Sequence, residues 1–400
     1  MAAAPGQTVI ENPAKPKAAN AGRIIAPREV LAISDEGTSD YYFKWPRELR
    51  TAPGGSLLLT DEDQVLEFDA NGKLVRNLFK KGQGPGEMPY PGACVATEKN
   101  RVVYSGYPGK LVYFGLSGQF EKEIAVRPGG RTSLTFLLEH AGTFYFEAGE
   151  FPRTTGDPDF VDNPRTIVAV SGTDGTIKPL TSFATRAWVV TSPGGGGGMF
   201  PVTSLIATPY GESTMALAHT EDYLIKIYDP AADKIVREFR RPYERVKGAP
   251  LTEAEKKGGI IIDNKHYSRP ERKFENDVKN ILTRDGEIWA VTSTRDEAKG
   301  VLIDVFDGEG IYRDCFWLKL PEPALGSLQS PGQCALDGEF LWVVERAEDE
   351  TFSITKYWVT SSQAGGTGPI RGQSPAVWRA ERQPARGQGG DMRPSPRKTP

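Results

Sequence analysis

The sequence has 400 residues, a formal net charge of −3 and a pI near 5.9, which gives no indication of bulk nucleic-acid binding. No apolar run approaches the roughly 20 residues that a transmembrane helix needs. Length alone would suggest two or three domains, but a repeat architecture can hold such a chain in one closed ring. The 44 glycines, 31 prolines and 10% aromatic residues favour short strands joined by tight turns.

The first 21 residues are rich in Ala and Pro and show no periodicity, which predicts a disordered leader over residues 1–21. They lack the basic and apolar regions of a signal peptide, yet they resemble the segment that follows a signal cleavage site. We therefore expect a periplasmic or extracellular protein, with a cytoplasmic protein as the alternative. Ile24–Ile33 (IIAPREVLAI) then reads as one strand without a hairpin partner of its own.

Six consecutive segments share one pattern of strand, turn, strand, variable loop, strand, turn and often a fourth strand. Their first turns are Gly54-Gly55, Lys99-Asn100, Ala141-Gly142, Tyr210-Gly211, Asp285-Gly286 and Asp337-Gly338. Their second turns are Asn71-Gly72, Ser117-Gly118, Asp174-Gly175, Ala232-Asp233 and Glu309-Gly310. Six units of this kind predict an all-β fold, a six-bladed β-propeller of four-stranded antiparallel blades over residues 22–362.

The sixth segment ends near Trp358 after only three strands, so the unpaired strand Ile24–Ile33 is its natural fourth. A ring closed in this way has no open edge between its first and last blades. We therefore predict that Ile24–Ile33 pairs beside Ser353–Val359.

Two insertions and a tail interrupt the pattern. Residues 149–165 form a loop rich in Pro and Asp, and residues 243–274 contain a short helix that Thr252 could cap. The glycines of residues 193–198 are expected to form a flexible connector. Residues 363–400 carry seven basic and two acidic residues, and we predict a disordered basic tail.

Three passages carry a resemblance to a known family: NGKLVRNLFKKGQGPGE at residues 71–87, the passage Ala21–Ile33, and YLIKIYDPAADKIVREF at residues 223–239. They resemble bacterial six-bladed β-propellers related to NHL repeats, over about residues 22–362. The resemblance implies this fold and favours export, because family members are frequently exported or lipid-anchored, although no lipobox cysteine is present. It points to no particular activity, since such proteins are mostly uncharacterised.

The sequence has few residues of the types that bind metals or act as nucleophiles. Cys94, Cys315 and Cys334 have no CxxC spacing, and the chain has three histidines in total, so no structural zinc site is expected. No GxSxG elbow occurs. Gly82–Glu87 lacks the spacing of a phosphate-binding loop, and we interpret it as the crossing from one blade to the next.

In a propeller, the loops between second and third strands share one face with the crossings between blades, at the mouth of the central channel. Five of the six loops are acidic and the crossings are mixed or basic. Charges of both signs at one mouth favour a zwitterionic or peptide-like partner. Carboxylates could also hold a divalent cation such as Ca²⁺, but no loop has DxDxDG spacing, so no cofactor is assigned.

Seven residues of this face are the candidate ligand-binding residues: Trp45, Asp61, Asp63, Tyr107, His219, Asp222 and Asp296. We predict a non-catalytic binding or scaffolding propeller that engages a protein or peptide-like partner at the channel mouth. The alternative is an enzyme resembling propeller lyases or lactonases, with a divalent metal held by mouth carboxylates and by His219. A third hypothesis is assembly into a larger complex through the tail or the long insertion. No catalytic residue is assigned.

Overall fold

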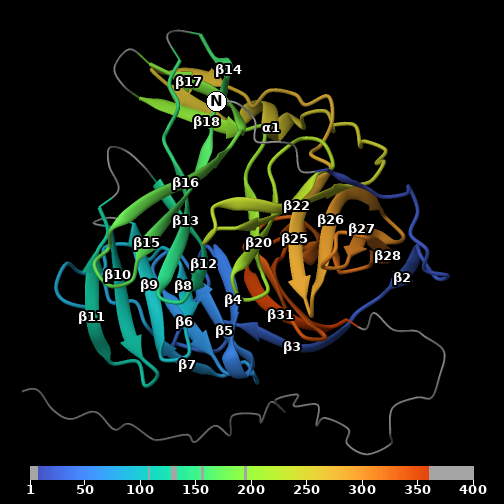
Figure 1. Cartoon of the computed structure of the whole chain (residues 1–400). Coiled ribbons are helices and arrows are strands. Elements are labelled where there is room, and N and C mark those ends of the chain that lie inside the picture. The colour runs from blue at the N-terminus through green and yellow to red at the C-terminus, as the bar shows by residue number, and fades with distance from the viewer. Residues whose placement is uncertain (1–7, 107–108, 128–132, 155–156, 193–195, 360–400) are drawn as a thin grey trace, which may run out of the picture. The chain divides into compact units, whose positions relative to one another are not determined.

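The computed structural model describes residues 8–106, 109–127, 133–154, 157–192 and 196–359 (Figure 1). Tyr107 and the predicted basic tail, residues 363–400, therefore lie outside the described residues. Within the described ranges, regular structure is almost entirely β-strand, with two short helices, α1 (Glu253–Lys257) and α2 (Glu322–Leu328), and one 3₁₀ turn, η1 (Pro53–Gly55). No helix in the described ranges has the length and hydropathy that crossing a membrane requires.

Most of the strands form a series of antiparallel sheets that follow one another along the chain. The first sheet contains β4 (Glu48–Ala52), β5 (Ser56–Thr60), β6 (Val65–Phe68) and β7 (Leu74–Asn77). The second contains β8 (Cys94–Ala96), β9 (Asn100–Gly106), β10 (Gly109–Gly115) and β11 (Phe120–Ala125). The third contains β12 (Ser133–His140), β13 (Thr143–Gly149), β15 (Arg165–Ser171) and β16 (Ile177–Phe183).

The later sheets recruit strands from the N-terminus. The fourth contains β19 (Ile206–Tyr210), β20 (Thr214–Ala218), β21 (Ile225–Asp229), β22 (Lys234–Arg240) and β1 (Ile10–Glu11). The fifth contains β25 (Val278–Arg284), β26 (Glu287–Asp296), β27 (Gly300–Phe306), β28 (Tyr312–Leu318) and β2 (Arg23–Ile25). The next contains β29 (Cys334–Asp337), β30 (Phe340–Arg346), β31 (Phe352–Trp358) and β3 (Arg28–Ser34).

Neighbouring sheets pack face to face through hydrophobic clusters, which is the arrangement of a β-propeller. Between the second and third sheets, the rings of Tyr104 and Phe146 lie 4.8 Å apart. The sheet of β29–β31 shares a cluster with the first sheet, and this cluster contains Trp342, Phe68 and Ile33. The packing therefore runs from the last sheet back to the first and closes the ring.

The predicted closing strand is present, but it is shorter than expected. Strand β3 pairs antiparallel with β31, with Ser34 opposite Ser353, which confirms the predicted pairing. The prediction of one strand over residues 24–33 is wrong, because β2 instead pairs parallel with β28. Pro27 lies between β2 and β3; it has no N–H for a sheet ladder and restricts the backbone of the preceding residue.

The predicted disordered leader is wrong for part of residues 8–21. Strand β1 pairs parallel with β22, and the Asn12 side chain that follows it is buried. Asn12 Nδ2 donates to Gly310 O (2.9 Å) and Arg240 O (3.2 Å), and its Oδ1 accepts from Tyr312 N–H (2.8 Å). The Asn12 side chain thus joins the fourth and fifth sheets through hydrogen bonds. We call residues 10–34 the N-terminal strap.

The turn chemistry explains why the hairpins form where the sequence places them. Gly72 in the Asn71-Gly72 turn has a φ of +78°, and a Cβ there would come within 2.8 Å of the Leu31 side chain. Glycine is therefore needed both for the backbone conformation and for the approach of β3. Gly82–Glu87 lies between β7 and β8, which agrees with its interpretation as a crossing.

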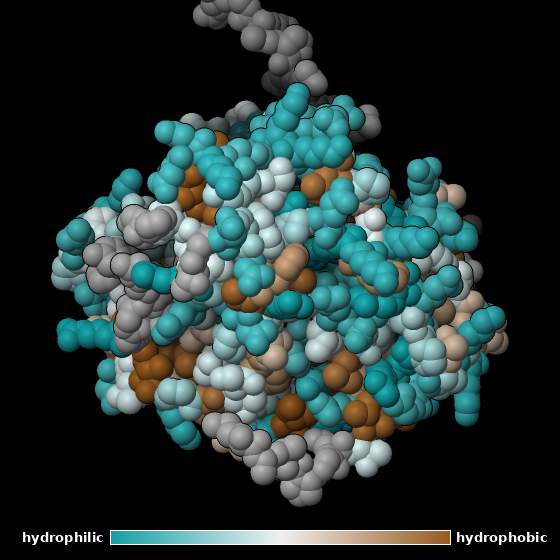
Figure 2. Space-filling view, turned by 90° about the horizontal axis from the view of Figure 1, so that it is seen from above, coloured by the Kyte–Doolittle hydropathy of each residue, from teal (hydrophilic) through white to brown (hydrophobic). Residues whose placement is uncertain are grey.

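The two insertions and the segment 186–201 build a separate group of strands, so the prediction of a loop over residues 149–165 is wrong, whereas the predicted short helix is α1, where Thr252 Oγ1 accepts Glu255 N–H at 3.2 Å. Strands β14 (Asp159–Asp162), β17 (Arg186–Thr191) and β18 (Gly197–Pro201) form one sheet, and β23 (Ile260–Ile262) and β24 (Lys265–Tyr267) form a hairpin. With α1 these strands form what we call the accessory module, at the top of Figure 1. The view from above shows a mainly hydrophilic surface with scattered hydrophobic groups (Figure 2).

Part of the glycine run is structured, which corrects the prediction of a flexible connector. Gly197 and Gly198 begin β18, and residues 193–195 lie outside the described residues. A Cβ at Gly197 would meet the Phe151 ring at 2.8 Å, and one at Gly198 would meet Ile260 at 2.5 Å. These glycines therefore allow two apolar side chains to pack directly on the backbone of the strand.

The strap yields a first testable prediction. Asn12→Ala removes three hydrogen bonds and leaves the peptide groups of Gly310 and Tyr312 without this partner, so we expect a loss of about 1–3 kcal/mol of unfolding free energy. Amide hydrogen exchange should accelerate in β1 and β2 before it does in β3. Asn20→Ala, an exposed position of the strap, is the control and should change neither measurement. Unchanged exchange in β1 and β2 of Asn12→Ala would contradict the assigned role.

Candidate functional site: the central channel

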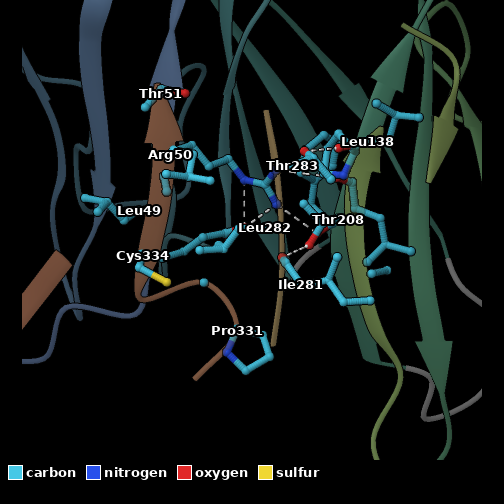
Figure 3. Close-up of a pocket in the computed structure, with 18 of the residues that line it drawn as sticks. Leu49, Arg50, Thr51, Leu138, Thr208, Ile281, Leu282, Thr283, Pro331 and Cys334 are labelled. Carbon is cyan, nitrogen blue, oxygen red and sulfur yellow. Dashed lines mark hydrogen bonds and ion pairs between the residues drawn. The ribbon is translucent and has the colours of Figure 1, made fainter. Parts of the chain in front are cut away.

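The innermost strands of the sheets surround a cavity of about 340 Å³ (Figure 3). Strands β4, β8, β12, β19, β25 and β29 each contribute residues to its wall. Each of them ends its sheet in the strand order, so each turns one row of peptide groups toward the channel. The channel is therefore lined by backbone groups as much as by side chains.

Threonine hydroxyl groups donate hydrogen bonds to some of the backbone carbonyl oxygens of the inner strands. Thr208 Oγ1 on β19 donates to Ile281 O at 2.7 Å, and Thr283 Oγ1 on β25 donates to Pro209 O at 2.7 Å. On another side of the channel, Leu49 N–H donates to Gly332 O at 2.7 Å. These bonds fix neighbouring inner strands to one another and give the cavity a defined wall.

Arg50 is the cation that enters the cavity. It extends from β4 (Figure 3) and donates from Nη2 to Phe136 O at 3.1 Å and from Nη1 to Leu137 O at 3.4 Å. Its Nε donates to Glu48 Oε1 at 2.7 Å, and Nη2 also contacts this carboxylate. The guanidinium carbon lies 4.6 Å from the centre of the Phe136 ring. One arginine thus joins a carboxylate, an aromatic face and the backbone of β12.

A second cavity of about 370 Å³ continues from the first toward the starts of the inner strands. Glu48, Arg50 and Phe136 line both cavities, so the ion pair lies at their junction. Glu147 also lines the second cavity; burial raises the pKa of its carboxyl, while Arg165 Nε at 3.3 Å opposes the shift. The two cavities therefore combine the carboxylates of Glu48 and Glu147 with the Arg50 cation in a partly apolar wall.

The candidate residues of the first sheet form a loop structure beside the channel. Asp61 is fully buried, and its carboxylate accepts the N–H groups of Lys44 (2.8 Å), Trp45 (2.6 Å) and Glu62 (2.6 Å). Asp63 accepts the Tyr42 hydroxyl at 2.6 Å. The structure therefore brings Trp45, Asp61 and Asp63 together, but Asp61 shapes the loop and offers no free carboxylate.

His219 is buried at the end of β20. Its Nδ1 lies 2.9 Å from Ala184 O, and its Nε2 has no hydrogen-bond partner among the described residues. Burial lowers the pKa of His219, with the Ala184 carbonyl opposing the shift. Asp222, in the loop that follows, is exposed and lies 3.3 Å from Arg245 Nη1.

Asp296 closes a turn in the fifth sheet. Its Oδ1 accepts the N–H groups of Ala298 (2.9 Å) and Lys299 (3.0 Å). Burial opposes ionisation, but these hydrogen bonds and the Lys299 charge outweigh it and lower the pKa of Asp296. None of the six candidate residues that the structure describes is among those lining the two cavities.

The sequence did offer a signal for the missed pair. Glu48 and Arg50 alternate in the strand just before the Gly54-Gly55 turn, and the repeat pattern makes that strand the innermost of its blade. Two charged residues two positions apart in such a strand share one face, so they point toward the same space. In the described part of the chain, no group of three His, Cys, Asp or Glu side chains has an arrangement that could hold a metal ion.

The role of Asp61 can be tested through stability. Asp61→Ala leaves three loop N–H groups without their acceptor, and we expect a loss of about 2–4 kcal/mol of unfolding free energy in urea titrations. Asp63→Ala removes one hydrogen bond at the surface and serves as the matched control, with an expected loss of at most about 1 kcal/mol. Equal losses in the two variants would contradict the structural assignment of Asp61.

The depressed pKa of His219 predicts a pH dependence. The unfolded chain takes up a proton near the ordinary value of about 6.5 and the native state does so at lower pH, so unfolding is favoured as the pH falls below about 6.5. His219→Gln cannot titrate. Between pH 7 and pH 5 the wild type should lose more unfolding free energy than the variant, by about 1.4 kcal/mol for each pH unit of depression. Parallel profiles for the two proteins would contradict this assignment.

Comparison with known proteins finds solved structures with a similar fold. No protein-family model and no curated protein matches the chain. A presumed exported protein from Bacteroides fragilis is 14% identical, with a TM-score of 0.51 over 88% of this chain and 99% of that chain. Its likeness at this identity shows a shared fold alone.

Two further solved structures have TM-scores of 0.41. A gluconolactonase from Xanthomonas campestris is 13% identical, over 84% of this chain and 98% of that one. Regucalcin, a calcium-binding protein from Agrobacterium tumefaciens, is 10% identical, over 88% and 98%. These two likenesses carry no argument about the chemistry of this chain.

Proposed function

We propose that this protein is a six-bladed β-propeller related to NHL repeats, spanning about residues 22–362, that binds a protein or peptide-like partner at the mouth of its channel without catalysis. The observation that carries the proposal is the Glu48–Arg50 pair at the junction of the two cavities. The side chains of Arg50 and Glu48 are 21% and 18% exposed, so a ligand could meet both charges away from bulk water.

The charged termini of a peptide would match the charges of Arg50, Glu48 and Glu147. An arginine presents a planar set of N–H donors that matches a carboxylate, and here the Phe136 ring supports its guanidinium. Glu48 and Glu147 could accept the ammonium group of a peptide. Peptide groups at the edges of the inner strands could pair with the backbone of the same ligand. Complementary charges of this kind favour orientation and specificity as much as affinity.

Exposed aromatic side chains extend the proposed surface outward from the channel. Trp45 is 52% exposed, and its ring lies 6.2 Å from Phe352 and 5.8 Å from the Arg346 guanidinium. Tyr90, in the crossing that precedes β8, is 63% exposed. Aromatic residues and arginine are frequent binding hot spots, so Trp45 is proposed to contact the partner, with Asp63 and Asp222 as flanking charges.

Export is a further part of the proposal. Its support is the resemblance of the sequence to a family whose members are frequently exported or lipid-anchored, together with the shared fold of the presumed exported Bacteroides fragilis protein.

The binding proposal is tested with pools of random hexapeptides. One pool has free termini, and a second has acetylated and amidated termini. After gel filtration, mass spectrometry should find free-terminus peptides retained by the wild type and the capped pool retained at least tenfold less. Glu48→Gln/Arg50→Gln, which keeps polar groups of similar size, should lose this preference. Glu309→Gln/Arg237→Gln removes a Glu–Arg pair that lines neither cavity and is the matched control.

Two results would overturn the proposal. The first is no retention of either pool by the wild type. The second is retention by Glu48→Gln/Arg50→Gln that equals that of the wild type and of the control. A urea titration of each variant separates loss of binding from loss of folding.

A further inference from the structure

The second cavity of the channel has charges of both signs in its wall. Arg50 and Glu147 both line it, and its volume is about 370 Å³. A sphere of this volume is only about 9 Å across, which is small even for a ligand pocket. A ligand that meets both charges inside this cavity must therefore be short.

Arg50 keeps donor capacity for such a ligand. The bonds from Nε and Nη2 to Glu48, from Nη2 to Phe136 O and from Nη1 to Leu137 O engage four of its five N–H groups. Among the described residues, the remaining N–H on Nη1 has no acceptor. A carboxylate in the cavity can accept this N–H and also meet the charge of the guanidinium.

Glu147 on β13 is the acceptor that suits an ammonium group. Its carboxylate pairs with Arg165 Nε at 3.3 Å, and the two side chains are 16% and 15% exposed. Burial nevertheless raises the pKa of the Glu147 carboxyl, so Arg165 compensates only part of the cost of its charge. A second cation in the cavity would favour the ionised form further.

Tyr104 on β9 adds an uncharged polar group to the wall of the same cavity. It is 4% exposed, and its ring lies 4.8 Å from that of Phe146. Its hydroxyl has no hydrogen-bond partner among the described residues, which is rare for a buried polar group. A phenol can donate one hydrogen bond and accept another, so the N–H or the C=O of a ligand's peptide group can supply the missing partner.

The reach of a peptide sets the length that fits. An extended chain spans about 3.5 Å per residue. The charged ends of a dipeptide or tripeptide are therefore about 7–10 Å apart, whereas those of an extended hexapeptide are about 20 Å apart. The shorter peptides can place both termini inside the second cavity, and an extended hexapeptide cannot.

We propose that the second cavity is a binding site for dipeptides and tripeptides with two free termini. This inference rests on the proposed function and narrows the class of its ligand. Arg50 donates to the ligand carboxylate, Glu147 accepts from the ligand ammonium, and the Tyr104 hydroxyl pairs with a peptide group between them. Free amino acids lack that peptide group, and longer peptides engage the cavity through one terminus at a time.

The length preference is measured by equilibrium dialysis with four pools at equal total concentration: free amino acids, random dipeptides, random tripeptides and random hexapeptides. Mass spectrometry should find the dipeptides and tripeptides retained at least tenfold more than the other two pools. Retention of hexapeptides equal to that of the short peptides would overturn this inference and leave the proposed function standing. Retention of no peptide pool would overturn both.

Two conservative variants test the assigned contacts. Glu147→Gln and Tyr104→Phe should each lower dipeptide retention at least fivefold, and Glu147→Gln should also remove the preference for free over acetylated amino termini. Glu238→Gln breaks a similarly buried ion pair, with Lys226, and Tyr145→Phe removes the hydroxyl of another buried tyrosine. Glu238 and Tyr145 line neither cavity, so these two controls should bind like the wild type.

The variants can also refute the assignment. Unchanged retention by Glu147→Gln would place the ligand ammonium elsewhere. Unchanged retention by Tyr104→Phe would show that a water molecule satisfies the hydroxyl and that the peptide group is not recognised there. A urea titration of all four variants separates a lost contact from a loss of folding.

Discussion

The pairing of β3 with β31 is the interaction on which the rest of the structure depends. A sheet with two apolar faces must be covered on both sides, and a ring solves this only when its last sheet packs on its first. Here the strand from the N-terminus completes the last sheet and places Ile33 in the same cluster as Phe68 and Trp342. The strap covers further strand edges as well, because β1 and β2 pair with the outer strands of two other sheets.

Closing the ring creates the channel as a consequence. Each inner strand keeps one row of unpaired peptide groups, and buried groups of this kind need partners. Thr208, Thr283 and Arg50 supply some of them by reaching from one inner strand to another. Arg50 has a further effect, because it also pairs with Glu48, which shares its face of β4. Arg50 meets the need of buried backbone carbonyls for a donor, and the Glu48–Arg50 ion pair therefore lies where a ligand could enter.

The sequence predicts local features better than distant ones. The strands around Asn71-Gly72 follow from turn chemistry, which is local, whereas the closing pair joins residues more than 300 positions apart and was found only by counting strands along the whole chain. The pairing of β1 and β2 was missed because it depends on backbone groups and on Asn12, whose partners are more than 200 residues away. Asp61 was read as a free ligand because its three backbone donors are visible only after folding. The burial of His219 could not be read from a loop sequence for the same reason.

The unpaired edges of the inner strands also limit how a ligand can bind in the channel. At the channel, the edges are buried and are satisfied by side chains of the ring itself, so a ligand must compete with Arg50 or use it.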